Sequence, residues 1–164
     1  MLRAKSVVDA LKGCGISHVV WLPDSESKFM YDALHEEQAL NLVPVCREGE
    51  AFSLAAGLYM GGKEPVVLIQ NTGMFESGDV IRGTTLALHF PLVMMIGYRG
   101  YVGMKEGRKP VDTAGLYTEP YLKMFGIPYH IVEDDDDIGN ISRAYAEARE
   151  TSGPVAVLIG VEYD

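Results

Sequence analysis

Short apolar runs alternate with mixed polar segments along the whole chain. The runs are four to six residues long, and most continue without a polar interruption. Continuous apolar runs are typical of strands that helices cover on both faces, as in a parallel sheet. The runs predict six strands, at 18–22, 42–45, 65–69, 91–96, 127–132 and 155–159.

The segments between these runs predict helices, the first of them from apolar residues at helical spacing. The expected helices are at 3–13, 28–37, 48–61, 77–88, 115–125 and 137–151. We expect loops at 70–74 and over the glycine-rich stretch 97–113. This alternation indicates an α/β domain: a three-layer, doubly wound, flavodoxin-like sheet of about six mainly parallel strands with helices on both faces. Residues 1–164 are expected to form one domain.

Composition narrows the classes of function. Hydrophobic residues make up 48% of the 164 residues, which is ordinary for a globular protein. No apolar stretch reaches the roughly 18 residues of a membrane span, and the N-terminus lacks the apolar core of a signal peptide. The net charge of −9 argues against a nucleic-acid partner. We therefore expect a cytoplasmic protein that binds neither membrane nor nucleic acid, with Cys14 and Cys46 as reduced thiols.

The common signatures of nucleotide, metal and hydrolase sites are missing. The chain has no GxGxxG, no GxxxxGK[ST] and no GxSxG motif, and its four histidines are scattered. The acidic run 133–137 is explained by a solvated loop whose last carboxylates face a helix N-terminus. We therefore predict no metal site in this chain.

Polar residues follow several of the predicted strands at their carboxyl ends. They lie in 23–25, at Glu48, in 71–74 and in 98–100. The carboxyl edge of an open α/β sheet is where ligands bind, so these segments are expected to converge on a site. Glu50 competes with Glu48 for the central role, because residues two apart lie on different faces of a helix. The pattern alone leaves that choice open.

The stretch 97–113 is basic in an acidic chain. It carries Arg99, Lys105, Arg108 and Lys109 against Glu106 and Asp112, which gives four positive minus two negative charges, or +2. A basic loop beside a ligand site favours an anionic substrate. A solvated loop without any ligand explains the same charges equally well.

The segment 47–51, Arg-Glu-Gly-Glu-Ala, is followed by Leu-Ala-Ala-Gly-Leu-Tyr at 54–59. This pattern resembles the pyrimidine-binding (PYR) domain of thiamine diphosphate enzymes. Segments 22–25, 70–74 and 95–100 are similar in particular to those of sulfopyruvate and phosphonopyruvate decarboxylases. The resemblance covers nearly the whole chain.

The resemblance implies roles for individual residues. Glu48 would hydrogen-bond a ring nitrogen of the cofactor's aminopyrimidine and favour the tautomer that removes the thiazolium C2 proton. The aminopyrimidine would be lined by Pro23, Thr72, Gly73 and Met74. Asp24, as a second catalytic residue, would face the reacting carbon together with Ser25 and Asn71, and Arg99 would meet a distal anion of the substrate.

The resemblance also implies a missing half. Enzymes of this kind bind the cofactor's diphosphate through Mg²⁺ in a second domain marked by a GDG motif, whereas here Gly78-Asp79 is followed by Val80. We therefore expect a hetero-oligomer in which a β subunit carries the diphosphate and metal half. The expected substrate is a small anionic 2-oxo acid, sulfopyruvate before phosphonopyruvate.

Three alternatives remain open from the sequence. An apolar pocket near Trp21 and Phe75 would favour another thiamine diphosphate lyase or carboligase. A non-catalytic flavodoxin-like binding module would lack the partner subunit. A self-associating homo-oligomer would be inactive alone.

Overall fold

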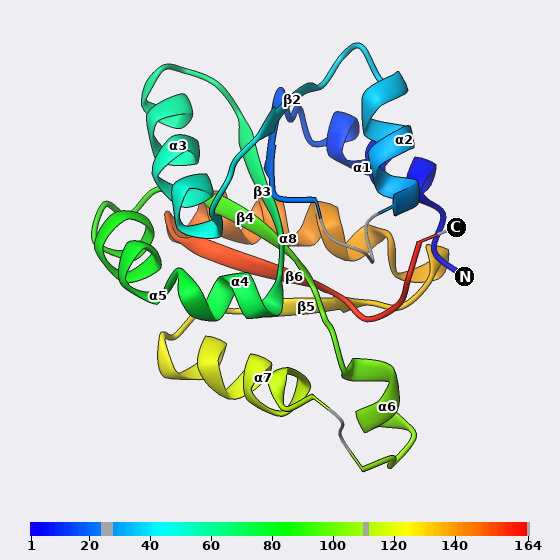
Figure 1. Ribbon diagram of the computed structural model, residues 1–164. Helices are drawn as coiled ribbons and strands as arrows, with labels where there is room; N and C mark the ends of the chain where they lie inside the picture. The colour runs from blue at the N-terminus through cyan, green and yellow to red at the C-terminus, as the bar shows by residue number, and fades with distance from the viewer. Residues whose placement is uncertain (24–27, 110–111, 164) are drawn as a thin grey trace.

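A six-stranded sheet with every strand parallel forms the centre of the molecule (Figure 1). The computed structural model describes residues 1–23, 28–109 and 112–163. The strands are β1 (His18–Trp21), β2 (Asn41–Pro44), β3 (Pro65–Gln70), β4 (Leu92–Gly97), β5 (Tyr129–Val132) and β6 (Pro154–Ile159), in the order β2-β1-β3-β4-β6-β5. The predicted doubly wound α/β sheet is confirmed, and its strands are parallel throughout.

Helices cover both faces of the sheet (Figure 1). One face packs against α1 (Ala4–Gly13), α2 (Lys28–Glu36) and α8 (Gly139–Thr151). The other face packs against α3 (Glu48–Met60), α4 (Asn71–Glu76), α5 (Gly78–Val80), the π-helix η1 (Ile81–Leu86) and α7 (Ala114–Met124). Two short elements complete the described chain, α6 (Tyr101–Lys105) and the 3₁₀ helix η2 (Asp135–Asp137).

The central strands are buried on both sides, as their continuous apolar sequence predicts. Along β3, Val66 and Leu68 join the core under α1 and α8, whereas Val67 and Ile69 join the core under α3 and α4. This alternation follows from the two-residue period of a strand. The edge strand β2 pairs only with β1 and is half-buried, which is where a proline such as Pro44 is tolerated.

Three predicted boundaries are wrong. Residues 71–76 form helix α4 rather than a loop, and residues 101–105 form α6 within the expected loop 97–113. The expected helix 77–88 is instead the short α5 followed by a π-helix. Asn, Thr and Gly are poor helix formers, so α4 depends on tertiary contacts that local sequence does not report.

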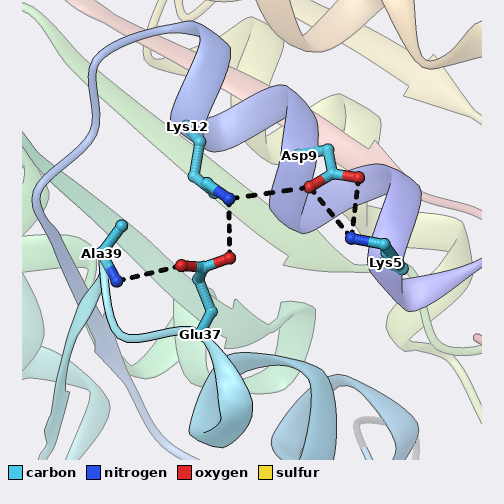
Figure 2. A network of polar contacts seen from close by, with 5 residues as sticks. All are labelled: Lys5, Asp9, Lys12, Glu37 and Ala39. Atoms are coloured by element: carbon cyan, nitrogen blue, oxygen red, sulfur yellow. Dashed lines mark hydrogen bonds and ion pairs between the residues drawn. The ribbon is translucent and has the colours of Figure 1, made fainter.

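Surface ion pairs join α1 to the end of α2 (Figure 2). Lys12 Nζ lies 2.7 Å from Glu37 Oε2 and 3.9 Å from Asp9 Oδ1, and Glu37 also accepts a 3.0 Å hydrogen bond from the Ala39 N–H. The hydrogen bond between them raises the pKa of Lys12 and lowers that of Glu37. These contacts lie on the face opposite α3 and α4.

Among the described helices, none combines the length and apolar character needed to cross a lipid bilayer.

The strand order reverses beside β1. The chain leaves β1 toward β2 on one side and later returns to place β3 on the other side. In open α/β sheets the crevice at such a reversal, at the carboxyl ends of the strands, is the usual place for a ligand. The segments that begin after β1, β2 and β3 therefore lie where a site is expected.

Candidate active site

Glu48 is the first residue of α3, directly after the turn that follows β2. The preceding residue, Arg47, is in the extended conformation and begins the helix. The Glu48 side chain is half-buried, and it makes no hydrogen bond or ion pair with any residue that the structure describes. A carboxylate in the first turn of a helix is favoured by the helix dipole. Glu48 therefore remains available to accept a hydrogen bond from a ligand.

Glu50, the competing carboxylate, has a structural role. Its Oε2 accepts a 3.2 Å hydrogen bond from the backbone N–H of Cys46. A glutamate at the third helical position that reaches back to the residues before the helix is a common capping arrangement. The geometry therefore distinguishes the two carboxylates between which the sequence could not choose. Glu50 is bonded to the backbone before α3, whereas the Glu48 carboxylate makes no such bond.

Gly73 brings α4 against Glu48. A Cβ atom at residue 73 would lie 2.2 Å from Glu48 Cγ and 2.5 Å from its Oε1. Any side chain larger than hydrogen would therefore displace the glutamate. Glu48 follows β2 and Gly73 follows β3, and the resemblance assigns both residues to one site. In the fold the two residues are in contact.

Asn71 is fully buried at the start of α4. Its Nδ2 donates to the Arg99 carbonyl oxygen at 3.0 Å and to Thr118 Oγ1 at 2.9 Å. Within the described chain its Oδ1 has no hydrogen-bond partner, although the atom is inaccessible to water. A buried acceptor without a partner is uncommon in folded proteins.

The other residues predicted to contact the cofactor differ in exposure. Thr72 is exposed and donates to Gln70 Oε1 at 2.9 Å, whereas Met74 is fully buried in the core between α4 and the sheet. Pro23 is exposed at the end of a described segment. Asp24 and Ser25 lie outside the described residues. The contacts of all these residues with a cofactor or substrate stay predictions.

Arg99 follows β4 and forms an ion pair with Asp112, with 2.9 Å between Nε and Oδ2. Its side chain is half exposed, and its backbone carbonyl is the acceptor for Asn71. The positive charges that the sequence predicted for 97–109 are largely paired: Lys105 contacts Glu133 and Arg108 contacts Glu106. The role of Arg99 toward a distal anion stays a prediction.

A cluster around Glu119 of α7 holds the turn before Arg99, and sequence reasoning missed it. Tyr98 donates to Glu119 Oε1 at 3.2 Å, Tyr129 donates to the other carboxylate oxygen, and Lys123 lies 3.5 Å away. The hydrogen bond from Tyr129 lowers the pKa of Glu119, whereas burial and the nearby carboxylate raise the pKa of Tyr98. Glu119 is therefore ionised and Tyr98 protonated at neutral pH.

A groove of about 740 Å³ lies between the start of α3 and the α4–α5 segment. Its wall includes Arg47, Gly49, Glu50, Ser53, Leu54 and Glu76, whereas Glu48 does not line it. This volume is within the range of small-molecule sites. Arg47 and Glu76 form an ion pair across it. In the part of the chain that the structure covers, no group of three or more His, Cys, Asp or Glu side chains could hold a metal.

The chemistry of Glu48 suits an organic ring. Its carboxylate has no partner among the described residues and lies against the backbone of Gly73. A carboxylate acceptor matches an N–H group of an aminopyrimidine. It therefore fits the pyrimidine half of thiamine diphosphate.

Comparison with known proteins agrees with this reading. Residues 1–107 match the family model described as "Thiamine pyrophosphate enzyme, N-terminal TPP binding domain". A sulfopyruvate decarboxylase subunit alpha from Methanothermobacter thermautotrophicus is 30% identical over 165 residues, which cover 98% of this chain and 96% of the relative. A sulfopyruvate decarboxylase from Methanosarcina acetivorans is 24% identical over 155 residues, covering 94% of this chain but only 39% of the relative.

Among solved structures, the benzoylformate decarboxylase from Polynucleobacter necessarius superimposes with a TM-score of 0.76 at 22% identity. The match covers 97% of this chain and 30% of that enzyme. At this identity the likeness concerns the fold. The chain thus spans less than half of the single-chain proteins that it matches, and nearly all of the relative named as a subunit.

Proposed function

The chain belongs to the thiamine pyrophosphate enzyme family through its N-terminal TPP-binding domain, and we propose that it is the α subunit of a two-subunit 2-oxo acid decarboxylase. In this proposal it supplies the glutamate that activates the cofactor, and a β subunit supplies the rest of the site. The observation that carries the proposal is the contact with Gly73 of the Glu48 side chain, which has no partner among the described residues.

Glu48 has one task in this proposal: it holds a proton between its carboxylate and a ring nitrogen of the aminopyrimidine. Bound thiamine diphosphate supplies the carbanion that attacks the 2-oxo acid and the electron sink for decarboxylation. The turn after β2 and the Gly73 backbone restrict where the Glu48 side chain can lie. A positioned acid–base group of this kind is worth about 10²- to 10⁴-fold in rate.

The other proposed contacts follow from the same edge of the sheet. Pro23, Thr72, Gly73 and Met74 are proposed to line the aminopyrimidine. Asp24, Ser25 and Asn71 are proposed to face the reacting carbon, and Arg99 the distal anion of the substrate. The two N–H groups of Asn71 are already bonded within the chain, and its Oδ1 is buried.

The proposed partner is a β subunit with the diphosphate-binding half. Support comes from the relative named as an alpha subunit, which this chain matches over almost its full length. The longer sulfopyruvate decarboxylase, of which the chain covers 39%, fits a version with both halves in one polypeptide. We propose that Mg²⁺ and the diphosphate are held mainly by the partner, so the active enzyme is a hetero-oligomer.

The proposed substrate is sulfopyruvate, a short 2-oxo acid with a second anionic group. The test is CO₂ release by this chain copurified with its partner subunit, with and without added thiamine diphosphate. We expect kcat/KM to be largest for sulfopyruvate, lower for phosphonopyruvate and lowest for pyruvate. Equal values for the three acids would refute the proposed recognition of the distal anion.

A matched pair of variants tests the role of Glu48. Glu48→Gln keeps the size of the side chain and removes its charge, and should lower kcat by about 10²- to 10⁴-fold. Glu50→Gln changes the capping carboxylate two residues away and should keep most of the activity. Equal activity of the two variants would remove Glu48 from the mechanism.

A further inference from the structure

Helix α7 holds α4 near both of its ends. Near the start, Thr118 Oγ1 accepts the 2.9 Å hydrogen bond from Asn71. Further along, the Tyr121 hydroxyl donates to the Met74 carbonyl oxygen at 3.1 Å. Gly78 leaves room for this hydroxyl, since a Cβ atom there would lie 2.9 Å from it. Neither Thr118 nor Tyr121 belongs to the residues proposed to contact cofactor or substrate.

Thr118 determines which way the Asn71 amide faces. The Thr118 hydroxyl donates its hydrogen to the Ala114 carbonyl at 2.8 Å, so only a lone pair is left for Asn71. The Arg99 carbonyl is likewise only an acceptor. Both neighbours therefore require the NH₂ group of Asn71. Its Oδ1 is left buried, with no hydrogen-bond partner among the described residues.

Helix α4 needs this support. It has six residues, begins Asn-Thr-Gly, and would not be stable as an isolated helix. Ser77 adds a buried hydrogen bond to the Gly73 carbonyl at 2.7 Å, but that bond is internal to the segment. The hydrogen bonds with Thr118 and Tyr121 join α4 to α7, its neighbour on the same face of the sheet, and an ion pair joins Glu76 of α4 to Arg47.

We infer that Thr118 and Tyr121 are positioning residues for the cofactor site. They hold α4 so that the Gly73 backbone meets Glu48. This inference rests on the proposed function and extends it from the residues that touch the cofactor to a helix that does not. Loss of either hydroxyl should loosen α4 and misplace Glu48 without removing any group that contacts the cofactor.

The test compares variants that each lose one hydroxyl group. In two of them the hydroxyl is bonded to α4, and in the two controls it is not. Thr118→Val and Tyr121→Phe each remove one of the bonds and keep the volume of the side chain. Thr85→Val is the control for the first, because Thr85 is also fully buried but its hydroxyl has no partner in the described chain. Tyr117→Phe is the control for the second, on the exposed side of α7.

Three measurements separate positioning from plain stability. Hydrogen exchange of residues 71–77 in the full chain reports on α4 without any cofactor. Titration of thiamine diphosphate and steady-state kinetics of the chain with its partner subunit report on the site. Thr118→Val should accelerate exchange at 71–77 and lower kcat by on the order of 10- to 100-fold. Thr118→Ser, which restores a hydroxyl, should recover both.

The outcomes distinguish this inference from the function that it rests on. If Thr118→Val and Thr85→Val have equal exchange rates at 71–77 and equal kcat, the inference is wrong, even where Glu48→Gln is inactive. If Glu48→Gln keeps full activity, the proposed function fails independently of Thr118. Support requires slow turnover and fast α4 exchange in Thr118→Val and Tyr121→Phe, with both controls close to wild type.

Discussion

The two faces of the sheet are built differently. Under α1, α2 and α8 the core includes large apolar side chains such as Leu11, Met30 and Leu34, and the side-chain hydrogen bonds described there are exposed or half-buried. Under α3, α4 and α7 the contacts include Ala51, Ala55 and bare glycine backbone. On that face polar groups are buried and bonded to each other.

This difference separates stability from function. A face of large apolar side chains stabilises the folded state through the apolar area that it removes from water. A face with close backbone contacts and a buried Asn71–Thr118 bond fixes positions instead. We therefore expect substitutions on the α1 face to change stability, and substitutions on the α4 face to change activity.

Gly73→Ala is expected to have the largest effect on activity. The added methyl group would overlap Glu48, with 2.2 Å between Cβ and Cγ, so the glutamate must move. Decarboxylation should fall about as far as in Glu48→Gln, by roughly 10²-fold or more. Gly57→Ala, in α3 itself, is the control, because a Cβ there would meet no described atom within 4 Å. Normal activity in Gly73→Ala would contradict the close contact.

Leu11→Ala should show the opposite behaviour. Leu11 is 1% exposed in the α1 core, and its truncation should lower the free energy of unfolding by about 2–5 kcal/mol. Urea denaturation measures this loss. Below the transition, kcat per folded molecule should match wild type. A drop in kcat comparable to that of Gly73→Ala would show that the two faces are not separate in function.

A smaller effect is expected from Glu119 as the pH falls. Hydrogen bonds, chiefly from Tyr129, lower its pKa below the ordinary 4.5, so its contribution to stability is complete above that value and is lost as the pH falls through the lowered pKa. Glu119→Gln should therefore cost about 1 kcal/mol at neutral pH and less in acid. Thermal melts from pH 7 to pH 3 measure the difference. The same difference in stability between wild type and Glu119→Gln at every pH would contradict the lowered pKa of Glu119.

The smallest effect is expected from Lys12→Met on the α1 surface. Its ion pair with Glu37 is solvent-exposed in large part, and such pairs contribute little to stability (Figure 2). The thermal midpoint and kcat should both stay within error of wild type. A clear loss of stability would show that the surface network matters more than the apolar core beneath it.

The fold was predictable because buried strands have a strong local signal. The run 65–69 lies within β3, Pro65–Gln70, and the other central strands agree as closely. Helix α4 was missed because Asn-Thr-Gly-Met has the composition of a turn. Its helical form depends on Thr118 and Tyr121, 47 residues further along the chain from their partners.

The site was predictable in part. The position of Glu48 after a strand was visible, but the choice over Glu50 needed a resemblance, since the capping bond to Cys46 has no signature strong enough to assign it. The charge of Arg99 suggested a ligand, whereas the structure pairs it with Asp112. Residues 117–119 are part of the resemblance, but no role was predicted for Thr118 or Glu119, because their partners come from distant segments of the chain.

The most direct test of the role of Glu48 is the rate at which the C2 hydrogen of bound thiamine diphosphate exchanges with deuterium, measured by NMR after acid quench. The sample is this chain assembled with its partner subunit. We predict that Glu48→Gln slows the exchange by about 10²- to 10⁴-fold, while Glu50→Gln leaves it unchanged. Exchange at the wild-type rate in Glu48→Gln would contradict the account.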